Sequence, residues 1–322
     1  MLGIGIIGCG AISHFHIRSY LEMDNVSIKA ISDINTETMK KISDTLKVDC
    51  YVNYEDLLAR DDIDLVSVCT PSGLHKDIVV AAANMKKNVI VEKPIDVTIE
   101  KIDTMVKACR KNGVKLACIF NNRYREGNIF LKKAIEEGRF GNIINANAVI
   151  RWYREPEYYS NSNWKGTMTL DGGGALMNQS IHYIDLLLWL VGDVRSVFAY
   201  TDTLIHNNIE AEDLSVAVFR FRNNALGSII AGTSIFPGFP AEIQITGERG
   251  SASIVDGSIK YWLFKDNHIL DEEAKKHMFI EIDNDRAHEP MAFDHTYHKR
   301  QIASVVNAII NNCEPDINGE EA

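Results

Sequence analysis

IGIIGCGAISHFH, residues 4–16, is the stretch from which the fold can be worked out. The apolar residues up to Ile7 predict a buried strand, the Gly-Cys-Gly sequence predicts a tight turn, and the residues from Ala11 onward predict a helix. A glycine turn between a strand and a helix occurs in many folds, so the neighbouring sequence has to decide what this one does.

Short apolar runs and longer amphipathic runs alternate through about residue 120. Runs such as Val89–Val91 are apolar at consecutive positions, as expected of strands that are covered on both faces. The alternation predicts an α/β domain over residues 1–120 with a doubly wound parallel sheet. Its predicted helices cover residues 11–22, 36–46, 74–87 and 99–111.

From Asn142 onward, strand-like runs follow one another through short polar turns, a pattern typical of antiparallel pairing. Two helices are predicted in this part, over residues 175–190 and 293–311. Residues 121–322 are therefore predicted to form an α+β domain with a large open, mostly antiparallel sheet. The predicted strands lie within residues 142–153, 213–221, 225–236, 241–247 and 250–257.

Composition excludes several classes of protein. The 322 residues carry a net charge of −10, and Lys and Arg are scattered, so nucleic acid is not an expected partner. No run approaches the ~20 apolar residues that a membrane span needs. The six cysteines show no CxxC spacing, which predicts reduced thiols, a cytoplasmic location and no metal site.

The spacing Gly8-x-Gly10-x-x-Ser13 indicates that the opening turn can bind a dinucleotide pyrophosphate. Gly8 makes the turn, Gly10 lets the backbone approach a pyrophosphate, and the helix N-terminus supplies amide donors. Ser13 replaces the third glycine or alanine of the dinucleotide fingerprint, and Asp33 ends the next strand, where a carboxylate accepts hydrogen bonds from a ribose. The alternative is a phosphate-free turn with a solvated aspartate. The predicted cofactor contacts are Gly8, Gly10, Ala11, Ile12 and Asp33.

Asp33 also bears on the choice of cofactor. Its carboxylate would repel a ribose 2′-phosphate, and the following Ile34-Asn35-Thr36 supplies no arginine to receive one. The sequence therefore favours NAD over NADP.

Two further motifs have a catalytic and a structural interpretation. Lys93 of Glu-Lys-Pro ends a predicted strand, where partial burial and a nearby nicotinamide cation would lower its pKa for alcohol proton transfer; alternatively it is a surface lysine before a turn. Asn178, His182 and Asp185 follow three glycines and are predicted to share one face of the helix over residues 175–190. In the structural interpretation, this face is only a solvated surface, opposite the apolar stripe of Leu186, Leu187 and Leu190.

The glycine loop with its Asp, TPSGLH (70–75), VEKP (91–94) and GGGALMNQSIHYID (172–185) resemble, in order and spacing, the Gfo/Idh/MocA oxidoreductases. The resemblance covers nearly the whole chain. It implies an N-terminal Rossmann domain and a C-terminal domain whose open sheet forms subunit contacts in a homodimer or homotetramer. It also implies NAD(P)-linked oxidation or reduction of a hydroxyl on a sugar, nucleotide sugar or cyclic polyol.

The resemblance also implies roles for single residues. Lys93 matches the lysine that contacts the substrate hydroxyl, and His182 matches the histidine near the same hydroxyl. Asn178 stands where inositol dehydrogenases carry Asp, which puts an inositol-like substrate in doubt and leaves proton transfer mainly to Lys93. Further cofactor contacts are predicted at Thr70, Pro71, His75, Glu92 and Lys93, and candidate substrate contacts at Arg123, Trp164 and Lys165.

Other functions stay open at this point. The same fold serves a sugar-sensing regulator, and an NAD-assisted glycosidase would use the cofactor without net turnover. The loop over residues 152–166 is rich in aromatic residues, which suits stacking on a sugar, a packed surface or a subunit contact, so the sugar itself is not determined. Members of the family usually continue past Asn318–Ala322 into a last helix, which is either absent or outside this sequence.

Overall fold

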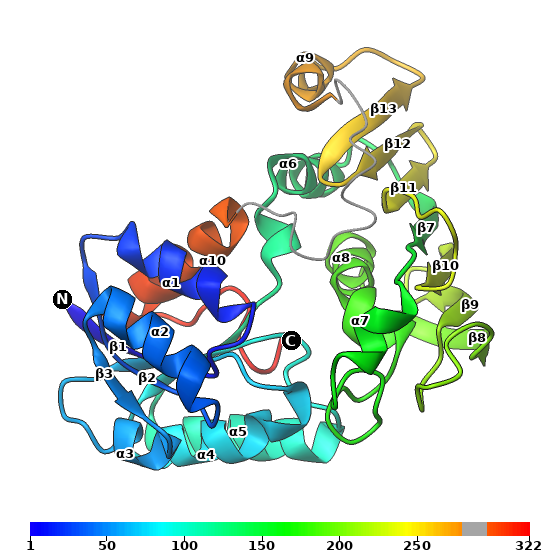
Figure 1. The fold of residues 1–322 in the computed structure, drawn as a ribbon. Helices are drawn as coiled ribbons and strands as arrows, with labels where there is room; N and C mark the ends of the chain where they lie inside the picture. Colours follow the sequence, from blue (N-terminus) through cyan, green and yellow to red (C-terminus); the bar gives the residue numbers. More distant parts are fainter. Residues whose placement is uncertain (279–294) are drawn as a thin grey trace. The chain divides into compact units, whose positions relative to one another are not determined.

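A computed structural model describes residues 1–278 and 295–322, which divide into two compact units (Figure 1). The first unit contains Met1–Asn121, Thr169–Gly172 and the C-terminal residues from helix α10 (Thr296–Ile310) onward. The second unit contains Asn122–Met168 and the described residues from Gly173 to Met278.

The first unit is built on a six-stranded parallel sheet, as predicted. Its strand order is β3-β2-β1-β4-β5-β6, so the order reverses between β1 and β4, where ligands of such folds bind at the carboxyl ends of the strands. The strands are β1 (Leu2–Ile7), β2 (Val26–Ser32), β3 (Asp49–Tyr51), β4 (Leu65–Val68), β5 (Asn88–Val91) and β6 (Leu116–Cys118).

The helices of this unit follow the predicted positions closely. They are α1 (Ser13–Leu21), α2 (Thr36–Leu46), α3 (Tyr54–Leu58), α4 (His75–Asn84) and α5 (Ile99–Asn112). The sequence analysis missed β3 and α3, because β3 has only three residues, two of them exposed, and shows no apolar pattern.

Helix α10 lies beside α1 in the first unit (Figure 1). Its apolar residues Ile302, Val305 and Val306 are buried in one cluster with Ile4 and Ile17. The predicted second domain, residues 121–322, includes α10, whereas the structure assigns this helix to the first unit. The first two residues of the predicted helix over 293–311 lie outside the described residues.

The second unit is built on a seven-stranded sheet of order β13-β12-β11-β7-β10-β9-β8. Its pairs are antiparallel except β7 with β10, which run parallel. The sequence analysis missed β8 and β13. The strands are β7 (Ile143–Arg151), β8 (Val194–Asp202), β9 (Leu214–Phe221), β10 (Leu226–Gly232), β11 (Glu242–Gly247), β12 (Gly250–Val255) and β13 (Ser258–Phe264), and the helices are α6 (Glu126–Glu136), α7 (Pro156–Ser160), α8 (Ile181–Val191) and α9 (Ile269–Ala274).

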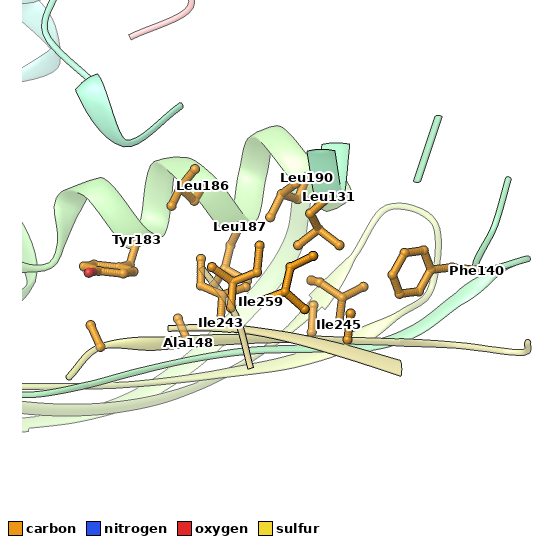
Figure 2. Packing of buried hydrophobic residues seen from close by; sticks show 14 of the residues in the cluster. Leu131, Phe140, Ala148, Tyr183, Leu186, Leu187, Leu190, Ile243, Ile245 and Ile259 are labelled. Atoms are coloured by element: carbon orange, nitrogen blue, oxygen red, sulfur yellow. The ribbon is translucent and has the colours of Figure 1, made fainter. Parts of the chain in front are cut away.

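Figure 2 shows how α8 covers one face of this sheet. The predicted stripe of Leu186, Leu187 and Leu190 is buried and points toward sheet residues such as Ile243 and Ile245. The predicted single helix over 175–190 is instead a π-helix, Ala175–Gln179, followed after Ser180 by α8.

The sheet also carries apolar side chains that remain exposed. Val197, Phe198 and Tyr200 of β8 and Val216 and Val218 of β9 are each at least 45% exposed. No helix among the described residues is both long and apolar enough to cross a membrane.

Candidate active site

The predicted site residues divide between the two units. The dinucleotide residues and Lys93 belong to the first unit, and Asn178, His182, Arg123, Trp164 and Lys165 belong to the second.

The glycine turn has the geometry that a pyrophosphate requires. Gly8 has a φ of +94°, and a Cβ there would lie 2.7 Å from the carbonyl group of Cys69, so only glycine fits between β1 and β4. A Cβ at Gly10 would meet nothing within 4 Å, so the backbone is open on that side. Within the described residues no side chain caps the start of α1, whose first turn has no acidic residue.

Thr70 provides a second test of fit to a dinucleotide. Its hydroxyl oxygen is buried and has no hydrogen-bond partner among the described residues. A buried hydroxyl without a partner is costly unless a ligand or water satisfies it. The open Gly10 backbone and the Thr70 hydroxyl therefore both fit a bound dinucleotide beside the ends of β1 and β4.

Asp33 lies directly beside the glycine turn. One carboxylate oxygen accepts a hydrogen bond from Cys9 N at 2.5 Å, and the other accepts one from Asn35 N at 2.7 Å. Each carboxylate oxygen can accept a second hydrogen bond, so the group can still receive ribose hydroxyls. The neighbouring Ile34 side chain is 89% exposed.

His75 lies at the start of α4, directly after the Thr70 loop. The imidazole is fully buried, with Nε2 3.0 Å from Thr70 O and Nδ1 3.1 Å from both Pro94 O and Ile95 O. Burial lowers the pKa of His75, although the backbone hydrogen bonds oppose this. The ring thus ties the Thr70 loop to the Lys93 loop, and a cofactor contact at His75 stays a prediction.

Lys93 follows β5 at the same edge of the sheet. Its side chain is half-buried, and burial lowers the pKa of its amine, as predicted, while the charges of Glu92 and Asp171 act in the opposite direction. Glu92 is 5% exposed and points into the protein: Oε1 lies 2.9 Å from His16 Nε2, and Oε2 accepts the Lys93 N–H at 3.1 Å. The carboxylate is thus engaged within the protein, and a cofactor contact at Glu92 stays a prediction.

The glycines before α8 make room for the protein's own backbone. A Cβ on Gly174 would lie 1.8 Å from Glu212 O, which accepts a hydrogen bond from Ala175 N at 2.9 Å. The Glu212 carboxylate accepts hydrogen bonds from Gly174 N and Leu176 N at 3.3 and 2.8 Å. The carboxylate therefore binds the start of the helical segment that carries Asn178 and His182, a role the sequence analysis missed.

Asn178 is connected to the aromatic loop through its neighbour. Its Oδ1 accepts a hydrogen bond from Gln179 Nε2 at 2.9 Å, and the same amide donates to the Tyr158 hydroxyl at 2.8 Å. Lys165 Nζ lies 3.6 Å from the centre of the Tyr158 ring. Arg154, buried, donates to Gln179 Oε1 at 3.1 Å, so the loop and the helix form one hydrogen-bonded assembly.

Asp185, predicted to share one helical face with Asn178 and His182, lies in α8, whereas Asn178 lies in the preceding π-helix. Asp185 is buried and forms an ion pair with Arg123, with Nε 2.9 Å from Oδ2 and Nη2 2.5 Å from Oδ1. The Arg123 guanidinium also lies 5.6 Å from the Trp189 ring. This pair stabilises the second unit, and substrate contacts by Arg123, Trp164 and Lys165 stay predictions.

The sequence analysis included Arg154 and Tyr158 only as part of the aromatic loop, and it did not identify their contacts with Gln179. The one sequence signal for Gln179 was its position directly after Asn178 in the glycine-rich motif. His16 and His298, which flank Glu92, are 282 residues apart along the chain, and no local pattern relates them.

Known proteins share both units. The Gfo/Idh/MocA oxidoreductase family model with an NAD-binding Rossmann fold matches residues 2–120, and the Gfo/Idh/MocA C-terminal domain model matches residues 129–253. The uncharacterized oxidoreductase YrbE of Bacillus subtilis is 30% identical over 77% of this chain and 72% of its own length. Myo-inositol 2-dehydrogenase of Thermotoga maritima is 29% identical over 77% of this chain and 73% of its own length.

Among solved structures, the WlbA dehydrogenase of Bordetella pertussis, in complex with NADH and UDP-GlcNAcA, matches with a TM-score of 0.91. It is 35% identical, and the match covers 99% of this chain and 91% of that one.

The first unit combines a parallel sheet with a glycine turn suited to a pyrophosphate, and the same chain carries an α+β unit. These features place the protein in the class of two-unit oxidoreductases with a nicotinamide dinucleotide cofactor. The chain belongs to the Gfo/Idh/MocA family, which confirms the resemblance drawn from its motifs. It transfers a hydride between its cofactor and a hydroxyl or keto group of a sugar, nucleotide sugar or cyclic polyol.

Proposed function

We propose that the substrate is a nucleotide sugar that carries a carboxylate, of the UDP-N-acetylhexosaminuronate class. The observation that carries this proposal is the likeness to WlbA, whose complex contains NADH and UDP-GlcNAcA, at 35% identity over 99% of this chain. The inositol dehydrogenase relative is less identical and matches a smaller share of the chain. Asn178, at a position where inositol dehydrogenases carry Asp, supports the same choice.

NAD is the proposed cofactor in preference to NADP. Asp33 is anchored beside the glycine turn by its hydrogen bond from Cys9 N, so its negative charge lies at the end of β2, where the adenosine ribose is expected. A 2′-phosphate there would meet a carboxylate and, at the next position, the exposed apolar side chain of Ile34. Both features favour a ribose with a free 2′-hydroxyl.

Lys93 is the proposed catalytic base. NAD, when bound, supplies the hydride acceptor. Burial lowers the pKa of Lys93, so more of the amine is neutral near physiological pH than for an exposed lysine. In the oxidation direction the substrate O–H bond breaks and its proton passes to Lys93 Nζ; in the reduction direction the ammonium returns that proton.

His182 is proposed to assist by hydrogen bonding near the same hydroxyl, with Asn178 four residues before it in the sequence. The Asn178 oxygen already accepts from Gln179, and an amide carries no charge to stabilise an imidazolium. Proton transfer therefore depends more on Lys93 than on His182.

The test is a comparison of substrates that differ by one group. The purified protein is mixed with NAD and either UDP-GlcNAcA, UDP-GlcNAc or myo-inositol, and NADH formation is followed by absorbance in steady-state and single-turnover experiments. We expect the highest kcat/KM for UDP-GlcNAcA, by at least about tenfold, which corresponds to ~1.4 kcal/mol of transition-state binding. Preferential oxidation of myo-inositol, or equal rates with and without the carboxylate, would overturn the proposed substrate class.

We also propose that the protein is a cytoplasmic homodimer or homotetramer. Five exposed apolar residues of β8 and β9 lie on neighbouring strands, and a second copy of the chain would remove them from water. The six cysteines are all free thiols, which suits a reducing compartment.

A further inference from the structure

A buried hydrogen-bonded cluster lies behind Lys93 in the first unit. Its members come from three elements and one loop: His16 and Tyr20 from α1, Ser67 from β4, His298 from α10, and Glu92 from the loop after β5. All five are less than 9% exposed. We call them the Glu92 cluster.

The contacts of the cluster converge on one carboxylate. The Tyr20 hydroxyl lies 2.7 Å from Ser67 Oγ, which lies 3.1 Å from His16 Nδ1, and His16 Nε2 lies 2.9 Å from Glu92 Oε1. His298 Nε2, from α10, lies 3.7 Å from the same Glu92 oxygen. Lys93 N donates to the other oxygen, Oε2, at 3.1 Å.

This arrangement determines which group is charged. Burial alone would raise the pKa of Glu92, but the hydrogen bond with His16 and the nearby His298 ring hold it well below its usual range, so the carboxylate is an anion. Asn121 Nδ2 lies 2.9 Å from His298 Nδ1; because the amide donates, the His298 ring proton is on Nε2, facing Glu92. Burial lowers the pKa of His298, which keeps that ring neutral.

A buried anion next to the half-buried Lys93 changes the proton affinity of the lysine amine. The charged or titratable groups that act on the Lys93 amine include Glu92, Asp171, Cys118 and His298. Burial lowers the pKa of Lys93, and the negative charges of Glu92 and Asp171 raise it. The proton affinity of Lys93 is thus a balance between desolvation and these carboxylates.

We propose that Glu92 is a positioning residue that sets the pH range in which Lys93 accepts a proton, through a carboxylate fixed by His16 and His298. The role rests on the proposed function of Lys93 as the base. Its hydrogen bond to Lys93 N also fixes the backbone from which the lysine side chain extends. His16 belongs to α1 and His298 belongs to α10, so two helices together fix the position of the Glu92 carboxylate.

The first experiment measures the titration of Lys93 without any sugar. The full-length protein is labelled with acetic anhydride over a range of pH, and the modification of Lys93 is quantified by peptide mass spectrometry. We expect Glu92→Gln to move the midpoint of the Lys93 labelling curve to lower pH by about 1 pH unit or more, because removing a nearby negative charge favours the neutral amine. An unchanged midpoint would overturn the proposal.

Tyr20→Phe is the matched control, because it removes a buried hydroxyl from the far end of the cluster and leaves the Glu92 charge. We expect its labelling midpoint to match the unmodified protein; a shift as large as that of Glu92→Gln would mean that any disturbance of the cluster has this effect, which contradicts a role for charge. If Glu92→Gln does not fold, the double variant His16→Gln with Glu92→Gln removes the charge while retaining a neutral hydrogen-bonded pair.

The second experiment uses the pH dependence of oxidation. The acidic limb of kcat/KM should move to lower pH in Glu92→Gln by the same amount as the labelling curve, because the neutral amine is the active form in this direction. A labelling shift without a shift in the activity profile would mean that Lys93 is not the base, whereas the absence of a labelling shift overturns the role of Glu92 even if Lys93 is the base. If the protein oxidises none of the sugars, the labelling experiment still tests the role of Glu92, because it uses no sugar.

Discussion

Replacement of Lys93 by Met is the most direct test of the proposed chemistry. Methionine is unbranched and similar in length, so it can occupy the half-buried position after β5, but it can neither accept nor return a proton. Substrate and cofactor would still bind to the remaining groups. The variant therefore removes one chemical property and little volume.

The expected loss follows from what Lys93 does in the proposed reaction. General acid–base assistance is typically worth ~10²–10⁴ in rate, which corresponds to ~2.7–5.4 kcal/mol of transition-state stabilisation. An ordinary lysine titrates near ~10.4, so each unit by which burial lowers the pKa gives roughly tenfold more neutral amine at a fixed pH. We expect the loss for Lys93→Met to fall in or above this range.

The assay separates chemistry from binding. Hydride transfer is measured as single-turnover NADH formation, and NAD affinity is measured by calorimetry in the same preparation. NAD binding should change little, because the proposed pyrophosphate and ribose contacts lie at Gly8, Gly10 and Asp33. His182→Ala should cost less than Lys93→Met, since Asn178 provides no carboxylate to hold the imidazole protonated. If Lys93→Met keeps most of its activity, this mechanism is wrong.

Three further predictions concern the cofactor, the open sheet and the buried ion pair. Asp33→Ser combined with Ile34→Arg should shift affinity from NAD toward NADP, and tighter binding of NADP than of NAD by the unmodified protein, measured calorimetrically, would contradict the proposed preference. Phe198→Glu should shift a dimer or tetramer toward monomers in light scattering, because it places a charge on the exposed apolar face; a monomeric unmodified protein at micromolar concentration would exclude this interface. Asp185→Ala should lower the free energy of unfolding by ~3–5 kcal/mol, seen as a lower urea midpoint, because it leaves the Arg123 charge buried without its carboxylate. A raised KM with unchanged stability would instead favour Arg123 as a substrate contact.

The sequence by itself determined the parallel sheet and the type of its ligand. Strands that are buried on both faces need consecutive apolar residues, and a turn that approaches a pyrophosphate needs glycine, so both requirements are visible locally as Val89–Val91 and as Gly8-x-Gly10. The stripe of Leu186, Leu187 and Leu190 was likewise visible, because helical periodicity is a property of neighbouring residues.

Only the tertiary structure decided which polar residues face each other. Asp185 is buried in an ion pair with Arg123, which is 62 residues away along the chain, so no helical spacing around Asp185 could reveal its partner. Glu92 turns inward because His16 and His298, 282 residues apart, both reach its carboxylate when α1 and α10 pack together. Contacts of this kind depend on long-range packing, and no local periodicity in the sequence encodes them.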